Sequence, residues 1–330
     1  MSEIKQSLNE MQIVGAVEEV NLEFLKDQKV ELRRGDFKKE VVCDTVDFRN
    51  SSMTVRVERK DEDGNSLGET IIPVELRTLF NQNSKSLNDK GEVEENKGFK
   101  ALETIATYEK GTRVQITTRT DAIQENGYVD KYGKWSSRPI FVGQYVTSTN
   151  VPEEDKADAK ITGVIRSIKP EIKNEEETGR FFVEFYMFTY KGNTYPVTLA
   201  VNEDLADDFK DIYELGSSCQ LDVELISRTV GKPKTNKKNT FGRRESKIVE
   251  GYTVTEINVF GGDPDVFEEE NEYFVDIKDM KKAIEARELM IEQKIKDKAE
   301  KDKGGNTAKP KGLGQRRAVI EDVEDEESPF

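Results

Sequence analysis

The sequence predicts a mainly β protein in which two small five-stranded units are followed by one helix and an acidic tail. Three observations predict this fold class. Short stretches of alternating apolar and polar residues recur through 11–262, bounded by Gly and Asn. The same landmarks occur twice in the same order, and residues 263–330 then lose the alternation and become highly charged. A length of 330 residues agrees with about two domains.

The two units begin with similar stretches, QIVGAVEEV at 12–20 and KITGVIRSI at 160–168. Each continues with a strand-like stretch, a Gly-Asn turn, an apolar strand, a YEKG or YELG tetrapeptide, an alternating strand and a closing strand. In the first unit these lie at 52–60, 64–65, 70–76, 108–111, 112–120 and 141–149, and in the second at 181–190, 192–193, 194–201, 213–216, 219–227 and 249–259. This order indicates a duplication, and two unrelated β units with common turn residues remain an alternative.

The first unit is the longer one. Gly15 and Gly111 are 96 positions apart, whereas Gly163 and Gly216 are 53 apart, so the first unit carries 43 additional residues. Part of this excess is expected at 81–100, where a polar, turn-rich stretch predicts a loop insertion.

The second unit also contains a helical pattern. Leu205, Phe209 and Ile212 recur at helical spacing within 202–216, between the third and fourth strands. Five strands with a helix at this point form an OB-fold, a small barrel whose outer groove binds oligonucleotides. We therefore expect a first OB-fold domain at 1–150 and a second at 151–262.

The alternation in the strand-like stretch 181–190 separates two sets of side chains. Val183, Phe185 and Met187 fall on the face that fills the barrel. The opposite face carries an aromatic set, which predicts either base stacking or cover by a partner domain. This set is Phe182, Tyr186, Phe188 and Tyr190.

Three loops combine basic and aromatic residues. The stretch 228–247 holds eight basic residues and one acidic residue, and 124–138 occupies the same place in the first unit. Cations pair with phosphates, unpaired bases stack on aromatic rings, and the loop between the fourth and fifth strands of an OB-fold flanks its groove. A solvated lysine loop and a hairpin's own aromatic cluster are the alternatives. The predicted nucleic-acid-binding residues are Arg33, Arg34, Lys38 and Lys39 in a basic turn, Tyr128, Lys131, Tyr132, Lys134, Trp135 and Arg138, the strand residues Phe182, Tyr186 and Phe188, and Lys232, Lys234, Lys237, Lys238, Phe241, Arg243 and Arg244.

Composition restricts the possible chemistry. The absence of histidine excludes Cys/His zinc sites and Ser-His-Asp triads. Cys43 and Cys219 are far apart, which predicts buried thiols in a reducing compartment.

With no apolar run of membrane-spanning length and no signal-peptide pattern at the start, we expect a cytoplasmic protein, in the host cytoplasm if viral. We expect no cofactor, no metal and no enzymatic activity. The net charge of −15 does not oppose nucleic-acid binding, because the local potential of a groove governs contact with phosphate.

The C-terminal region predicts three segments. An acidic segment and a helix at 263–303 carry a narrow apolar stripe, which docks on the second barrel or pairs with another chain. The stripe consists of Ile277, Met280, Ile284, Ile291 and Ile295. Residues 304–330 follow as a flexible basic linker and a tail, EDVEDEESPF, which we expect to be disordered.

The closing residues EDEESPF resemble the end of single-stranded DNA-binding proteins (SSBs) of bacteria and some phages, which have an OB-fold body, a flexible linker and an acidic tip ending on Phe. The resemblance implies that the tip docks replication and recombination proteins such as a polymerase, helicase or primase, with Phe330 in an apolar pocket, and that it competes with DNA for the groove. The implied partner-binding residues are Asp325, Glu326, Glu327, Pro329 and Phe330. Bacterial SSBs carry one OB-fold per chain and form tetramers. Two barrels in one chain are more similar to a phage replication SSB and fit a monomer or homodimer.

The sequence thus predicts a protein that binds single-stranded DNA without sequence preference, and that coats and protects unwound DNA in replication, recombination and repair. Two alternatives remain. One is a β-rich viral interaction or assembly protein without DNA contact, and the other is a carboxylate-metal nuclease on an OB-like barrel.

Overall fold

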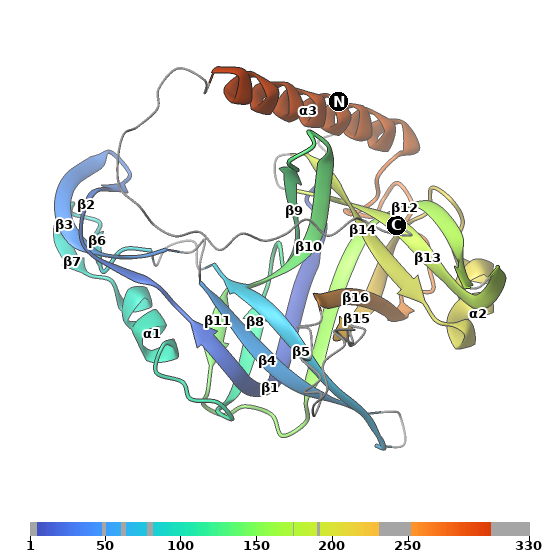
Figure 1. The fold of residues 1–330 in the computed structure, drawn as a ribbon, viewed down its shortest axis with the longest axis horizontal. Coiled ribbons are helices and arrows are strands. Elements are labelled where there is room, and N and C mark those ends of the chain that lie inside the picture. Colours follow the sequence, from blue (N-terminus) through green and yellow to red (C-terminus); the bar gives the residue numbers. More distant parts are fainter. Residues whose placement is uncertain are drawn as a thin grey trace, which may run out of the picture.

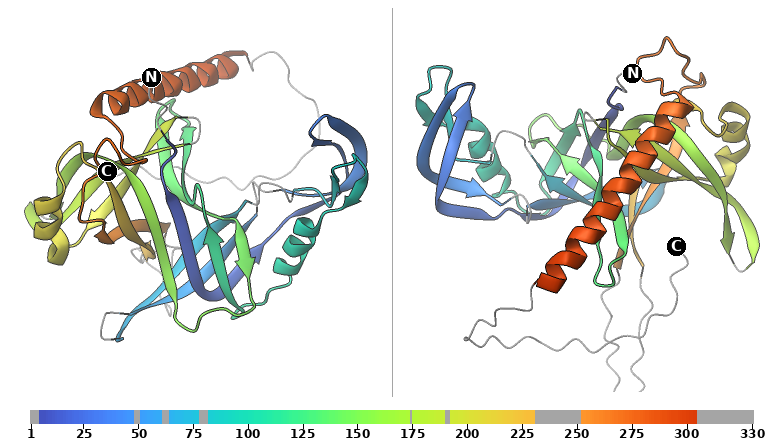
Figure 2. Two further views of the ribbon diagram at one scale, coloured as in Figure 1. Left: turned by 180° about the vertical axis from the view of Figure 1, so that it is seen from behind. Right: turned by 90° about the horizontal axis from the view of Figure 1, so that it is seen from above.

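A computed structural model describes residues 5–47, 51–60, 64–77, 82–173, 175–189, 192–230 and 252–304. In these residues the protein is mainly β, and one 12-stranded sheet winds through two adjacent barrels (Figure 1). A long C-terminal helix crosses one side of both barrels (Figures 1 and 2). None of the helices in the described part is both long and apolar enough to cross a membrane.

The second barrel is a closed ring of five strands. Its strands are β12 (Lys156–Lys173), β13 (Glu176–Phe188), β14 (Thr194–Val201), β15 (Ser218–Val230) and β16 (Tyr252–Gly262). They pair in the order β12-β13-β14-β16-β15 and return to β12, and only the β14–β16 pair is parallel. The short helices η1 (Glu203–Leu205) and α2 (Ala206–Ile212) connect β14 to β15. This is the OB-fold order predicted from the sequence.

The first barrel repeats this ring. Its strands are β1 (Asn9–Asn21), β4 (Ser52–Lys60), β5 (Ser66–Leu76), β8 (Arg113–Thr118) and the consecutive β10 (Trp135–Gly143) and β11 (Tyr145–Thr147). β10 runs parallel to β5, and β11 continues along β8, so together they act as the fifth strand. Helix α1 (Lys97–Ile105) again precedes the fourth strand, and the side chain of Asn96 caps it by accepting from the Gly98 amide. Two tandem OB-fold barrels are therefore present, as predicted.

The first barrel carries two projections, and the first of them accounts for part of its additional residues. Strands β2 (Phe24–Arg34) and β3 (Phe37–Val46) make a long hairpin between the first and second barrel strands, here called the arm (24–46). The stretch 81–100, predicted as a loop, contains β6 (Lys85–Leu87), β7 (Val93–Glu95) and the start of α1 in its described part. Strand β9 (Ile123–Val129) pairs with β10 to form a second projection, here called the hairpin (123–143).

Two glycines explain why the landmark stretches recur. Gly15 and Gly163 occupy the same position in the first strand of each barrel, where the chain passes against the second strand. A Cβ atom at Gly15 would lie 2.9 Å from Cγ1 of Val55 and closer still to the Arg56 carbonyl oxygen. At Gly163 it would lie 2.8 Å from Cε1 of Phe185 and closer still to the Tyr186 carbonyl oxygen. Both first strands then show a register shift two to four residues further on, between Val17 and Glu19 in β1 and between Ile165 and Ser167 in β12.

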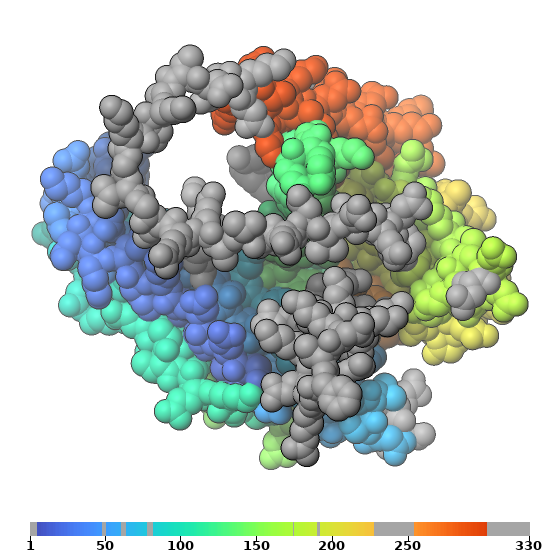
Figure 3. Space-filling model, viewed as in Figure 1, coloured from blue at the N-terminus to red at the C-terminus, as the bar shows by residue number. Residues whose placement is uncertain are grey.

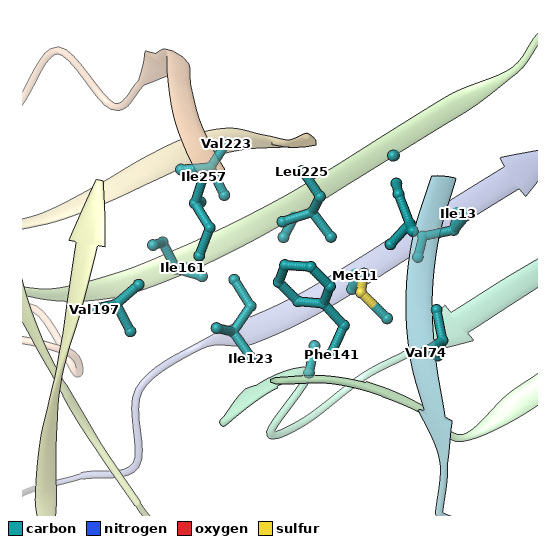
Figure 4. Close-up of a cluster of buried hydrophobic side chains, with 14 of the residues drawn as sticks. Met11, Ile13, Val74, Ile123, Phe141, Ile161, Val197, Val223, Leu225 and Ile257 are labelled. Atoms are coloured by element: carbon teal, nitrogen blue, oxygen red, sulfur yellow. The ribbon is translucent and has the colours of Figure 1, made fainter. Parts of the chain in front are cut away.

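The two barrels share one hydrophobic core. Strands β1 and β12 pair antiparallel, from Asn9 opposite Ile161 to Val14 opposite Lys156. Figure 4 shows Met11 and Phe141 of the first barrel beside Ile161 and Leu225 of the second, and all four belong to one buried cluster. The ladder and the common core join the barrels as one packed body.

Polar contacts reinforce this junction. The buried Asn9 side chain donates to the Ile123 carbonyl (2.7 Å) and to the Tyr195 hydroxyl (3.1 Å), and it accepts from the Ile123 amide (2.9 Å). Arg59 of the first barrel makes a two-point ion pair with Glu224 of the second, at 2.6 and 2.9 Å. Cys43 and Cys219 are free and buried, as predicted.

The predicted C-terminal helix is α3 (Ile277–Gly304). It docks within the chain, because its first half packs on the outside of the second barrel. Met280 and Ala283 of the helix form a buried cluster with Val164 and Phe188 of the barrel and with Val275 of the preceding segment. The second half of α3 extends to the hairpin of the first barrel (Figure 1).

Candidate nucleic-acid interface

The groove of an OB-fold lies on the outer face of the second and third strands, between the loop that joins strands one and two and the loop that joins strands four and five. In the first barrel this face belongs to β4 and β5. The arm is the first of these loops and the hairpin is the second. The space-filling view shows an open gap between the arm and α3, which lies against the hairpin (Figure 3).

One arm cation has a structural task. Arg34 donates to Asp89 (2.9 Å) and to the Leu87 carbonyl (3.0 Å), which fastens the arm to the β6–β7 turn. Beside it Phe37 packs on Gly91, where an added Cβ would lie 2.6 Å from the Phe37 ring. Arg34 therefore orients the arm and is partly engaged before any ligand arrives.

The other predicted arm cations lie near the tip. Arg33 and Lys38 face each other across the two strands, and Arg33 also pairs with Glu31. Lys39 is exposed like Lys38. An exposed ion pair such as Arg33–Glu31 contributes little stability and exchanges readily for a phosphate. The structure thus brings the basic turn predicted from 33–39 to one flank of the first barrel's groove.

The base of the arm is held by a second ion pair. Lys26 donates to Asp44 at 2.6 Å, and Asp27 adopts a positive φ of 52° beside it. The hydrogen bond from Lys26 lowers the pKa of the Asp44 carboxyl, and the same bond raises the pKa of Lys26. This contact fixes the strand at the irregular register between Leu25 and Gln28.

The hairpin has one face turned towards α3. Trp135 packs over Gly127, where an added Cβ would lie 2.6 Å from Cη2 of the indole, and Lys294 of α3 lies 4.9 Å from the centre of its ring. Glu125 on the same face pairs with α3. The predicted stacking residue Trp135 is therefore half-buried, and its Nε1 has no hydrogen-bond partner among the described residues.

The opposite face of the hairpin is open. Tyr128 and Arg138 alternate with the α3-facing residues and therefore point away from α3. Tyr128 is 52% exposed. Gln124 on this face accepts from Arg77, which directly follows β5, so the face adjoins the groove side of the barrel. Tyr128 and Arg138 thus form an aromatic and cationic pair beside the groove.

The tip of the hairpin is a defined turn. The Asp130 carboxylate accepts from the backbone amides of Tyr132 (2.9 Å) and Lys134 (2.8 Å). Lys131 lies 4.9 Å from the centre of the Tyr132 ring, which is 67% exposed. The predicted residues at this tip are exposed and are presented by a hydrogen-bonded turn.

The groove floor contains residues that the sequence analysis missed. Arg56 on β4 lies opposite Ile71 on β5, and Ile71 and Pro73 are exposed on the outer face. Arg56 lies within 3.8 Å of Glu18 and 3.6 Å of Glu69, so its charge is balanced at the surface. Strand alternation carries the signal for these positions, because Val55 and Val57 point inward on either side of Arg56.

The aromatic face of the second barrel differs from the prediction. Phe188 is 2% exposed and Tyr186 is 8% exposed. Phe188 packs in a buried cluster with Met280 and Ala283 at the start of α3. The expectation that these two rings are free to stack on bases is wrong, and the cover over Phe188 comes from α3 and the segment before it, where the alternative expected the partner domain. Burial also raises the pKa of the Tyr186 hydroxyl. Phe182, further along the strand, is half-buried.

Some predicted residues lie outside the described part of the chain. They are Tyr190, the loop residues Lys232, Lys234, Lys237, Lys238, Phe241, Arg243 and Arg244, and the tail residues Asp325, Glu326, Glu327, Pro329 and Phe330. Within the part that is described, no three His, Cys, Asp or Glu side chains come together as a metal site.

Comparisons with known proteins give three results. None of the curated proteins matches the chain in sequence. The wild-type single-stranded DNA-binding protein from Thermus aquaticus is similar in structure with a TM-score of 0.43 and 10% identity, over 81% of this chain and 97% of that chain. A deletion mutant of the same protein gives a TM-score of 0.42 and 10% identity, over 81% and 99%. Scores of this size carry no assignment, and the barrels described above rest on their own strand order. The YorF family model matches residues 7–298, from just before β1 almost to the end of α3, and the chain therefore belongs to the YorF family.

Proposed function

We propose that the protein binds single-stranded DNA along the outer face of β4 and β5, between the arm and the hairpin. The observation that carries this proposal is the open face of the hairpin, where exposed Tyr128 and Arg138 flank the groove of an OB-fold. Lys38 and Lys39 on the arm supply charge to the other flank.

The chemistry is that of a stacking platform with cationic walls. Bases stack on Tyr128 and on Tyr132 at the hairpin tip, and the phosphates contact Arg138 and the arm lysines. Stacking and phosphate contacts do not distinguish one base from another, so binding is independent of sequence. Duplex DNA binds more weakly, because paired bases do not offer their faces to the rings.

The test compares two exposed tyrosines. Tyr128→Ala is expected to weaken binding of a fluorescein-labelled oligo-dT by about 5- to 150-fold, the equivalent of removing one base stack. Tyr145→Ala is the matched control, since Tyr145 is 63% exposed but lies on β11, which pairs with β8 and with neither β4 nor β5. Fluorescence anisotropy against single-stranded and duplex DNA measures both. Equal affinities of wild type and Tyr128→Ala, or equal losses in the two variants, contradict the proposed site.

The basic loop of the second barrel extends the site in this proposal, because it joins the fourth and fifth strands as the hairpin does in the first barrel. Neutralising its cations to Gln is expected to reduce the slope of log affinity against log salt by about 0.7 for each phosphate that the loop no longer neutralises. An unchanged slope would show that the loop is only solvated. The residues to replace are Lys234, Lys237, Lys238, Arg243 and Arg244.

The acidic tip is proposed to recruit replication, recombination or repair proteins, as its resemblance to the SSB tip implies. Phe330 supplies buried area for a partner's pocket, and the six carboxylates of 321–330 supply charge. Deleting 321–330 should strengthen DNA binding at low salt, since a tethered polyanion competes for the groove. Phe330→Ala should abolish partner binding and leave DNA affinity unchanged. Weaker DNA binding after the deletion would contradict this role.

A further inference from the structure

Helix α3 connects the second barrel to the hairpin that flanks the proposed site. Its first half is anchored on the second barrel through Met280 and Ala283. From the middle of the helix onwards, three cations on one helix face, at intervals of seven and four residues, reach the hairpin. These cations are Arg287, Lys294 and Lys298.

Each cation contacts a different part of the hairpin. Arg287 donates to Glu125 at 2.5 Å, and the two side chains are only 8% and 12% exposed. Lys294 lies over the Trp135 ring. Lys298 donates to the carbonyl oxygens of Val129 and Asp130, both at 2.6 Å, directly before the turn. The contacts therefore extend along the hairpin from the body of β9 to the tip.

We propose that α3 is a brace for the hairpin and that Arg287 and Lys298 are positioning residues for DNA binding. They hold the hairpin so that its far face presents Tyr128 and Arg138 to the groove. The effect on DNA affinity rests on the proposed function, whereas the brace itself does not. A projecting two-stranded hairpin is marginally stable without tertiary contacts, so the anchored helix supplies the order that the hairpin lacks.

The location of Arg287 and Lys298 distinguishes residues that position the hairpin from residues that contact DNA directly. Arg287 and Lys298 are engaged on the face of the hairpin opposite Tyr128. A residue that only orders the binding surface changes affinity by changing the entropy lost on binding. It releases no counterions, and its removal leaves the salt dependence of binding unchanged.

The experiment uses the full chain with three substitutions of equal charge change. Arg287→Gln and Lys298→Gln are expected to lower the affinity for oligo-dT by about tenfold, the cost of ordering two or three side chains. Lys296→Gln is the matched control, because Lys296 is 67% exposed on the same helix and pairs with Glu292 one turn away. Arg287→Lys keeps a cation beside Glu125 and should restore most of the affinity.

A spectroscopic readout reports on the brace directly. Trp135 is the only tryptophan, so acrylamide quenching of its fluorescence measures how well α3 shields it. Quenching should increase in Arg287→Gln and Lys298→Gln and remain unchanged in Lys296→Gln. Circular dichroism confirms that the barrels stay folded in all variants.

The outcomes divide clearly. Increased quenching with a tenfold lower affinity and an unchanged salt slope supports the brace. Equal losses in Lys298→Gln and Lys296→Gln with reduced slopes would mean that α3 only attracts phosphate, and the proposal would be wrong. Increased quenching with unchanged affinity also overturns it, because the brace then positions nothing that DNA needs. If the wild-type chain fails to bind oligo-dT, the proposed function fails, while the quenching series still decides whether α3 braces the hairpin.

Discussion

Replacing Gly15 or Gly163 by alanine tests whether the repeated stretches mark one structural requirement. In each case the new methyl group would overlap a backbone carbonyl of the neighbouring strand, at Arg56 or Tyr186. A carbonyl cannot move aside by a side-chain rotation, so the two strands must separate. The change therefore acts on the barrel itself rather than on one replaceable contact.

The expected cost follows from two effects. Overpacking a tight interior position costs about 1–3 kcal/mol. Separating the strands also weakens at least one adjacent cross-strand hydrogen bond, worth about 0.5–1.5 kcal/mol. Each variant should therefore lose about 1.5–4.5 kcal/mol of unfolding free energy, a large part of the about 5–15 kcal/mol typical of a folded protein.

Guanidinium unfolding followed by circular dichroism measures this loss. The control is Gly261→Ala, a strand glycine whose added Cβ would meet only Asp222 at 4.0 Å. Gly261→Ala should be neutral or stabilise by up to about 1 kcal/mol, because alanine restricts the unfolded chain. If Gly15→Ala costs no more than Gly261→Ala, the close approach in the first strand does not constrain the barrel and the reasoning fails.

Three further predictions concern the core. Asn9→Ala should lower the free energy of unfolding by about 1–3 kcal/mol, because the Ile123 amide loses its buried acceptor, and Tyr195→Phe should lower it by less. Unfolding of the two single variants and the double variant measures the coupling between Asn9 and Tyr195. Equal losses in the two single variants would contradict the hydrogen-bond network around Ile123. Phe188→Ala should cost about 3–5 kcal/mol without a separate loss of DNA affinity, and a stable variant with weakened binding would return this ring to the interface. Burial raises the pKa of the Cys219 thiol to about 12 from 9.0, so as the pH rises the thiol ionises in the unfolded chain before it ionises in the folded one. The free energy of unfolding should therefore fall in this range by up to about 1.4 kcal/mol per pH unit. A denaturant midpoint that stays constant between about pH 8 and about pH 11 would contradict this.

Strand alternation predicted most of both barrels. It assigned Val183, Phe185 and Met187 to the interior, and all three are fully buried. It could not show what covers the opposite face of the same strand. The cover over Phe188 comes from Met280 and neighbouring residues, which are remote in sequence, and only the folded chain brings them together.

The arm was missed for a related reason. In β2 only Leu32 is buried, and most side chains along both arm strands are exposed, so the alternation of apolar and polar residues is weak along the arm. Its basic turn at 33–39 was recognised from charge alone. Its place beside the groove depends on where a hairpin leaves the barrel, which local composition does not encode.

The hairpin shows the limit for single residues. Sequence reasoning selected Tyr128 and Trp135 together, since both are aromatic and lie near lysines. They fall on opposite faces of the hairpin, and the pairing of Trp135 with Lys294 depends on a helix that begins more than a hundred residues later. The residue types identified the hairpin as a candidate region. Only the packing of the folded chain shows that Tyr128 is exposed and that Trp135 lies against α3.

The β1–β12 ladder has a consequence for assembly. The register pairs Asn9 with Ile161 and Ile13 with Ala157, and the spacing of Gly15 and Gly163 makes these two pairs equivalent to each other. The barrels thus meet as two identical subunits do about a two-fold axis, in a self-complementary interface. Two separate chains would form this contact only above their dissociation constant, whereas one chain keeps it at any dilution. Because the two barrels belong to one chain, their sequences can differ, which the identical subunits of a homodimer do not allow. Here one barrel carries an arm and the other carries a docked helix.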